Sequence, residues 1–200
     1  TLMQRAQQLG IPIPATRHVL TGDELLADMA ALHYPMVLKP FRSRVMLDAH
    51  WLTSSGRIVF TPEELRKALM EDQFANHPFM VQEYIEGVGQ GIFALYDHGR
   101  PVAFFAHRRI RERPPWGGVS VLSESLQPDA GMLSLAQRLL DDAQWHGVAM
   151  VEFKVARDGT PYLMEINTRF WGSLQLAVDA GVDFPSMLVD LALGEPVQSP

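Results

Sequence analysis

Apolar residues follow two kinds of spacing along this chain. Helical spacing with capping residues predicts helices at residues 1–9, 21–32, 61–72, 130–145, 170–180 and 184–193. Alternating or short apolar runs between turn residues predict strands at 34–40, 57–60, 79–85, 91–97, 101–107 and 119–126, and a hairpin within 147–172. Helices and antiparallel hairpins therefore mix in an order that predicts an α+β fold rather than a doubly wound sheet.

Residues 43–55 follow neither pattern. Arg44, Asp48, His50 and Trp51 occur there without a clear period. We therefore expect an irregular or mobile loop.

The hairpin within 147–172 is the most informative part of the sequence. Asp158-Gly159 is a strong two-residue turn signal. With that turn, Glu152 lies directly across from Glu165. One face then carries polar residues, namely Glu152, Lys154, Glu165 and Asn167. The other is expected to be a core face, formed by Val151, Phe153, Val155, Tyr162, Met164 and Ile166.

The polar face requires a compensating charge, because Glu152 and Glu165 repel each other when they lie directly opposite. Lys154 is one candidate. A divalent cation held by both carboxylates and the amide oxygen of Asn167 is the better one, and oxygen ligands favour a hard ion such as Mg²⁺ shared with phosphate. Arg169 could then reach the same phosphates bidentately. The alternative is an ordinary solvated strand face.

Composition narrows the class of protein. The 200 residues can bury a core in one domain or two small lobes, and the net charge of −6 disfavours non-specific nucleic-acid binding. There is no cysteine, so thiolate chemistry is excluded. No apolar run approaches the ~20 residues of a membrane helix, and we expect a cytoplasmic location without membrane contact. The chain starts at Thr1 in helical spacing, and we expect it to be a fragment of a longer protein.

Several segments occur in an order that resembles the ATP-grasp superfamily over nearly the whole length. They are GIPIPAT, YPMVLKP, FMVQEYIEG, GVAMVEFK and YLMEINTRFWG. The segment HRRIRERPPWGGVSVLSES is similar to the carbamoyl-phosphate-synthase-like branch, which includes predicted ATP-dependent carboligases. The resemblance implies two lobes of antiparallel sheets flanked by helices, which hold Mg-ATP between them. We expect a smaller nucleotide lobe at 15–82 and a larger lobe with the metal site at 83–200, without the domain that usually precedes the grasp fold.

The resemblance also assigns residues to the nucleotide. Lys39 matches the strand lysine that contacts the phosphates, although a surface lysine at a strand edge is the alternative. The adenine segment is expected to comprise Gln82, Glu83, Tyr84 and Ile85. Glu86 is a candidate for the ribose hydroxyls. An ordinary strand and turn is the alternative for this stretch.

The remaining matches concern the metal and the phosphates. Glu152, Glu165 and Asn167 match the ligands of Mg²⁺ or Mn²⁺, and Arg169 matches the catalytic arginine that stabilises the transferred phosphoryl group. Three arginines are expected to face phosphates or an anionic substrate, with a solvated basic loop as the alternative: Arg108, Arg109 and Arg111. Two histidines, His107 and His146, are attributed to structure rather than to acid–base chemistry.

The resemblance implies an ATP-dependent ligase that joins a carboxylate to an amine or a thiol through an acyl phosphate. Small-molecule substrates are the expected partners, and a homodimer is left open. Two departures qualify the hypothesis. Residues 41–57 contain only Gly56 where a glycine-rich phosphate loop is expected, and an earlier lysine would fall before Thr1. The alternative is therefore a nucleotide-binding sensor or scaffold without catalysis, and we expect the chain alone to be inactive.

Overall fold

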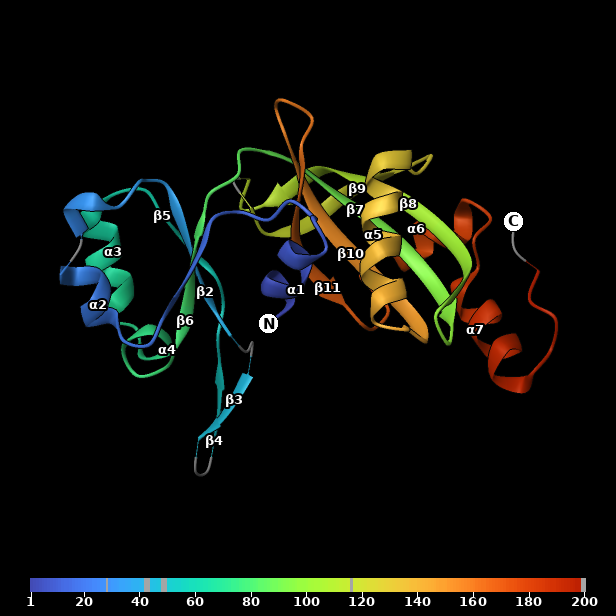
Figure 1. Cartoon of the computed structure of the whole chain (residues 1–200), viewed down its shortest axis with the longest axis horizontal. Helices are drawn as coiled ribbons and strands as arrows, with labels where there is room; N and C mark the ends of the chain where they lie inside the picture. The colour runs from blue at the N-terminus through green and yellow to red at the C-terminus, as the bar shows by residue number, and fades with distance from the viewer. Residues whose placement is uncertain (28, 42–43, 48–49, 116, 199–200) are drawn as a thin grey trace. The chain divides into compact units, whose positions relative to one another are not determined.

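The structure is a computed structural model that describes residues 1–27, 29–41, 44–47, 50–115 and 117–198 (Figure 1). The chain forms two compact units. The small unit is Pro14–Ile85, and the large unit combines Thr1–Ile13 with Glu86–Pro200. Each unit has its own antiparallel sheet and its own apolar core.

The small unit is a four-stranded sheet with helices packed on one face. Its strand order is β1-β6-β2-β5, with β1 at Thr16–Val19, β6 at Phe79–Glu83, β2 at Met36–Pro40 and β5 at Arg57–Val59. The helical elements are α2 (Gly22–Ala27), the 3-10 helix η1 (Met29–Ala31), α3 (Pro62–Leu69) and α4 (Asp72–Ala75). Their apolar residues pack on alternate strand residues, and the core includes Leu25, Leu38, Leu65, Phe74 and Phe79.

Helix α3 begins where the sequence predicts. The Thr61 hydroxyl accepts a hydrogen bond from the backbone N–H of Glu64 at 3.2 Å, and Pro62 occupies the first turn. Leu65 and Leu69 then face the core of the small unit.

The segment 43–55 was expected to be an irregular or mobile loop. Its described part contains a short two-stranded ribbon, so the expected irregular structure is wrong there. Strands β3 (Arg44–Leu47) and β4 (His50–Thr53) pair antiparallel, and Arg44 lies opposite Thr53. A two-stranded ribbon of its own need not alternate apolar and polar residues, so the sequence lacked the period that identifies a strand. Positions 43, 48 and 49 lie outside the described residues.

The large unit is a five-stranded antiparallel sheet with helices on both faces (Figure 1). Its order is β11-β10-β7-β8-β9, with β7 at Gly87–Asp97, β8 at Arg100–Arg113, β9 at Val119–Leu126, β10 at Gly147–Ala156 and β11 at Pro161–Asn167. Helices α1 (Leu2–Gln8) and α5 (Ala130–Asp142) cover one face, and α6 (Leu174–Asp179) and α7 (Phe184–Leu193) cover the other.

The helices of the large unit are short. The longest that the structure describes is α5, with 13 residues, whereas a bilayer-spanning helix needs about 20. Among the described helices, none combines the length and the apolar character required to cross a membrane. Helix α6 starts at Leu174 rather than at 170, because Trp171 packs into the core before the helix begins.

The pairing of β10 with β11 confirms part of the predicted register. Glu152 lies across from Glu165 and Met150 across from Asn167, as expected. Beyond Glu152 the register shifts by one residue, so that Phe153 pairs with Leu163. The predicted two-residue turn is therefore wrong.

The turn is one residue longer than the sequence suggested. The N–H of Ala156 donates to the carbonyl of Thr160 at 2.9 Å, which leaves residues 157–159 in the loop. A bulge at Met164 then restores the expected pairing of the two glutamates. As a consequence Leu163 is fully buried, whereas Tyr162 and Met164, which we expected in the core, are only half-buried.

This register predicts losses of different size for two neighbouring residues. We expect Leu163→Ala to lower the free energy of unfolding by about 2–5 kcal/mol, because it removes a fully buried side chain. Tyr162→Ala should cost much less, because Tyr162 lies on the polar face beside Lys154. Urea unfolding of both variants tests the bulge. A larger loss for Tyr162→Ala would contradict the observed register.

Candidate functional site

One face of the large sheet changes from apolar to polar along β10. Val148 and Met150 face the core under α6 and α7, where Trp171 packs on Phe93 with ring centres 4.4 Å apart. The next residues on the same face are Glu152 and Lys154. The candidate site therefore begins where the apolar cover of this face ends.

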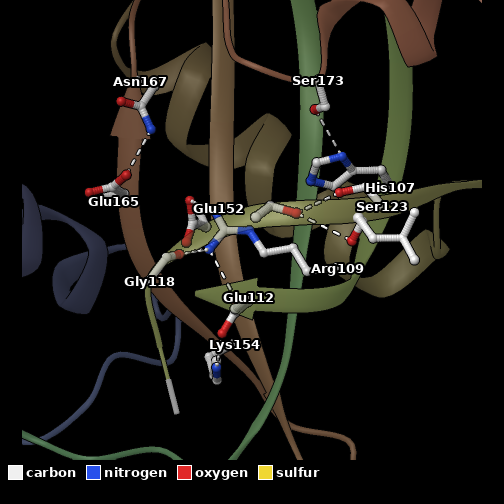
Figure 2. A network of polar contacts seen from close by, with 12 residues as sticks. His107, Arg109, Glu112, Gly118, Ser123, Glu152, Lys154, Glu165, Asn167 and Ser173 are labelled. Carbon is white, nitrogen blue, oxygen red and sulfur yellow. Dashed lines mark hydrogen bonds and ion pairs between the residues drawn. The ribbon is translucent and has the colours of Figure 1, made fainter. Parts of the chain in front are cut away.

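Four charged side chains form the centre of the site, and we call them the charge cluster: Arg109, Glu112, Glu152 and Lys154 (Figure 2). Nη2 of Arg109 donates to Oε2 of Glu152 at 2.5 Å, and Nη1 donates to Oε1 of Glu112 at 3.2 Å. Nζ of Lys154 lies 3.4 Å from Oε2 of Glu112. The side chains are only 8–14% exposed. Two positive and two negative charges thus balance with little help from water.

The structure gives Glu152 a partner that the sequence did not suggest. Lys154 pairs with Glu112, and Arg109 pairs with Glu152. Arg109 also donates to the carbonyl of Gly118 at 3.3 Å, which connects the cluster to the turn before β9 (Figure 2). Arg109 is therefore a strand residue with three partners rather than a residue of a solvated loop.

A bulge in β8 explains why Glu112 joins the cluster. Arg109 pairs with Ser123, but Arg111 pairs with Leu122, so Ile110 is an extra residue on β8. Simple alternation would place Arg109 and Arg111 on one face. The bulge instead brings Glu112 beside Arg109 and leaves Arg111 exposed. No pattern in the sequence indicates this bulge.

Alternate glycines on β7 lie beside the charge cluster, and Gly89 leaves room for it. A Cβ atom at Gly89 would lie 2.8 Å from Cδ of Arg109 and 2.9 Å from Oε1 of Glu112. A Cβ atom at Gly91 would lie 3.0 Å from the ring of Phe93. Gly87, Gly89 and Gly91 occur at every second position. This spacing indicates that one face of the strand is kept free of side chains. The prediction from sequence did not use this signal.

His107 lies beside the cluster and is buried, with 3% of its surface exposed. Its Nδ1 is 3.1 Å from the hydroxyl of Ser173 (Figure 2). Its ring packs edge-on against Phe93, with ring centres 4.6 Å apart. Burial lowers the pKa of His107 to about 4, and the positive charge of Arg109 contributes to the shift. The imidazole is therefore neutral near pH 7, in agreement with its assignment to structure.

The three expected metal ligands lie next to one another on β10 and β11. Glu152 and Glu165 are cross-strand neighbours, and Nδ2 of Asn167 donates to Oε1 of Glu165 at 2.8 Å (Figure 2). Glu165 is exposed, whereas Glu152 is largely covered and bonded to Arg109. Two carboxylates and an amide oxygen are the donors that Mg²⁺ prefers, so the residues fit the ion. Arg109 already pairs with Oε2 of Glu152.

The structure does not bring Arg169 or Arg108 into the charge cluster. The guanidinium of Arg169 is exposed and donates to the carbonyl of Phe170 at 3.0 Å. Arg108 forms an ion pair with Glu124 on the neighbouring strand. Both side chains are long enough to change partners in the presence of an anion.

Lys39 and Gln82 lie on the sheet of the small unit. In β2, Leu38 faces the apolar core, so Lys39 points to the opposite face, where it neighbours Met80. Gln82 is 2% exposed, and its Nε2 donates to the hydroxyl of Thr16 at 2.9 Å. Gln82 therefore holds two strands together.

The rest of the expected adenine segment follows β6. The N–H of Glu83 donates to the carbonyl of Ala15 at 2.9 Å. The ring of Tyr84 lies 6.4 Å from that of Phe60, and Ile85 is half-buried. Glu86 belongs to the large unit, where its carboxylate pairs with Arg157 at 2.6 Å on an exposed surface.

A family model decides the identity of the fold. The model described as "ATP-grasp in the biosynthetic pathway with Ter operon" matches residues 75–200. The chain belongs to this ATP-grasp family. The predicted ATP-grasp fold is thereby confirmed, with two antiparallel sheets flanked by helices. No curated protein matches this ATP-grasp chain.

Solved structures with the same fold share little sequence with this ATP-grasp chain. The ADP complex of an N5-carboxyaminoimidazole ribonucleotide synthetase is 17% identical, with a TM-score of 0.74 over 98% of this chain and 51% of the other. Biotin carboxylase from Campylobacter jejuni is 16% identical, with a TM-score of 0.75 over 98% and 46%. D-alanine–D-alanine ligase from Bacillus anthracis in complex with ATP is 18% identical, with a TM-score of 0.67 over 96% and 65%. The chain thus spans about half the length of the first of these proteins.

The low pKa of His107 predicts a loss of stability in acid. The unfolded chain takes up a proton below the ordinary pKa of 6.5, whereas the folded chain does so only near pH 4. Stability is therefore complete above pH 6.5 and should fall by about 3 kcal/mol as the pH decreases to 4. Urea unfolding at several pH values, with His107→Gln for comparison, measures this. An equal pH dependence in both proteins would contradict the assignment.

The charge cluster predicts that Arg109 is important for stability. Arg109→Gln leaves the covered carboxylate of Glu152 without its guanidinium, and we expect a loss of about 2–4 kcal/mol. Adding Glu152→Gln should recover part of the loss, because Gln at position 152 carries no charge that the guanidinium has to neutralise. Arg111→Gln, two residues away and exposed, is the matched control and should change stability by less than about 0.5 kcal/mol. Equal losses at both arginines would rule out the cluster as the cause.

Proposed function

We propose that this chain is part of an ATP-dependent ligase that joins a carboxylate to an amine or a thiol. The observation that carries the proposal is the pairing of Glu152 with Glu165 on an ATP-grasp sheet, with Asn167 bonded to Glu165. These oxygen donors suit Mg²⁺ bound to phosphate. ATP, ADP and ligase activities are named for the solved structures of the same fold, which supports the same chemistry here.

The proposed reaction has two steps. An oxygen of the substrate carboxylate first attacks the γ-phosphorus of ATP, the bond to the β-phosphate oxygen breaks, and ADP leaves. The amine or thiol then attacks the carbonyl carbon of the acyl phosphate, and inorganic phosphate leaves with the electron pair of the C–O bond. When bound, Mg²⁺ would neutralise charge on the phosphate oxygens.

Residues of the large unit would act on the phosphates. Glu152, Glu165 and Asn167 would hold Mg²⁺ or Mn²⁺. Because Arg109 already pairs with Glu152, its guanidinium would either share this carboxylate with the ion or turn to an anionic substrate. Arg169 would leave the carbonyl of Phe170 and donate to the transferred phosphoryl group. Arg111, exposed and two residues from Arg109, is a second candidate for the substrate anion.

Residues at the end of β6 and on β2 would bind the nucleotide. Lys39 would contact phosphate oxygens from the sheet face opposite the helices. The segment Gln82, Glu83, Tyr84 and Ile85 would hold adenine through its backbone and apolar side chains. Glu86 would bind the ribose hydroxyls, in exchange for its exposed ion pair with Arg157, which is worth less than about 1 kcal/mol.

The metal assignment predicts a selective effect of Glu165→Gln. We expect the affinity for Mg-ATP to fall about tenfold or more, because the substitution removes a charged ligand while Glu165 is exposed and the fold should persist. Calorimetry in Mg²⁺ and in EDTA separates the metal from the nucleotide. Glu195→Gln, an exposed glutamate beyond α7, is the control. Unchanged Mg-ATP affinity in Glu165→Gln would refute the metal assignment.

Ligase activity itself is tested on the longest natural protein that contains this chain. ADP release should require both a carboxylate and an amine or thiol from a panel of small molecules. Hydroxylamine should trap the acyl phosphate as a hydroxamate when the second substrate is omitted. Tight Mg-ATP binding without ADP release under any combination would instead indicate a nucleotide-binding sensor or scaffold.

A further inference from the structure

A second group of metal-binding side chains lies at the other end of the large sheet. Asp97 ends β7, His98 begins the turn to β8, and His146 lies between α5 and β10. Among the described residues this is the one group of three histidine, cysteine or acidic side chains whose potential ligand atoms lie within 4.8 Å of one another. Along β7, Asp97 is six residues, or about 20 Å, from Gly91 beside the charge cluster.

The contacts within this group are already close to those of a metal site. Nδ1 of His98 lies 2.7 Å from Oδ1 of Asp97, and Nδ1 of His146 lies 3.5 Å from the same oxygen. The two imidazole rings are 4.0 Å apart. Ligand atoms around a tetrahedral Zn²⁺ are about 3.3 Å apart, as its bond lengths of about 2.0–2.2 Å require. Small side-chain rotations would therefore place all three atoms around one ion.

The backbone holds the two histidines together. The N–H of His98 donates to Nδ1 of His146 at 3.3 Å, and the N–H of Gly99 donates to the carbonyl of Trp145 at 2.7 Å. His98 has a left-handed backbone with φ 45°, and Gly99 follows with φ 82°. These bonds fix the turn against the segment that carries His146. An ion would replace the bond from the N–H of His98 to Nδ1 of His146 and the contact between Nδ1 of His98 and Oδ1 of Asp97.

We propose that Asp97, His98 and His146 bind a divalent transition-metal ion such as Zn²⁺, with water completing the coordination. Imidazole nitrogen with one carboxylate oxygen selects Zn²⁺ and its transition-metal neighbours over Mg²⁺. The side chains of Asp97, His98 and His146 are 44%, 80% and 49% exposed, so an ion can enter and keep bound water. Arg100 is the cross-strand partner of Asp97, and its positive charge repels a bound cation. The coordinate bonds must therefore supply the affinity for the metal ion. The ion would clamp the β7–β8 turn to the start of β10.

Zinc titration of the untagged chain tests the proposal. Calorimetry with ZnCl₂ should show one ion bound per chain. His98→Asn and His146→Asn should each weaken binding at least tenfold. Asn tolerates the left-handed backbone of residue 98, and at 146 its amide oxygen can still accept the N–H of His98, so both variants should fold.

Two controls make the result specific. His33→Asn removes an exposed imidazole of the small unit and should leave zinc binding unchanged. Zn²⁺ should raise the melting temperature of the parent chain and of His33→Asn, but not of the two site variants. The proposal is overturned if the parent chain binds no zinc, or if His98→Asn and His146→Asn bind zinc as tightly as the parent chain. The zinc proposal can fail independently of the ligase proposal, because neither variant changes a residue that is predicted to bind Mg-ATP.

Discussion

The register between β10 and β11 is the constraint on which the candidate site depends. Cross-strand pairing places Glu152 against Glu165 on the face that carries Met150 and Asn167. Two like charges in this position are unfavourable by themselves. The pairing persists because Phe153 and Leu163 are fully buried on the opposite face, and a slip by one residue would expose them. Burial on one face thus keeps two acidic groups together on the other.

The charge cluster is the second consequence of the same sheet. Arg109, with 14% of its side chain exposed, neutralises one member of the glutamate pair from across β7. It can do so because Gly89 and Gly91 leave no side chain in between. The large unit therefore holds both the oxygen donors of the proposed metal site and a guanidinium that pairs with one of them. We regard this pairing as the property that most distinguishes the site, since metal or anion binding would redistribute the partners of Glu152 and Glu112.

Much of the architecture could be predicted from local patterns. The bounds of β9 and α7 agree with the sequence, since turn residues and caps delimit both elements. The ribbon of β3 and β4 was missed, because a pair of strands outside a larger sheet lacks the alternation that identifies a strand. Part of the candidate site was also predicted. The hairpin pattern placed three residues next to one another, namely Glu152, Glu165 and Asn167. The part of Glu112 was not predicted, because a bulge at Ile110 decides which face it takes. Arg109 was expected to face phosphates or an anionic substrate, and its pairing with Glu152 was not foreseen.

The sequence by itself determined the α+β class and the order of the elements, because alternation, caps and turn residues act over a few positions. The opposition of the two carboxylates was predicted with a turn one residue too short, and the bulge at Met164 restores it. Only the tertiary structure decided which charges meet. The bulges at Ile110 and Met164 each reverse the faces of the residues beyond them, and their position depends on pairing with a neighbouring strand. The tertiary structure also decides that Asp97, His98 and His146 lie together. His146 follows His98 by 48 residues in the chain, and they meet only because β10 pairs with β7 in the folded sheet.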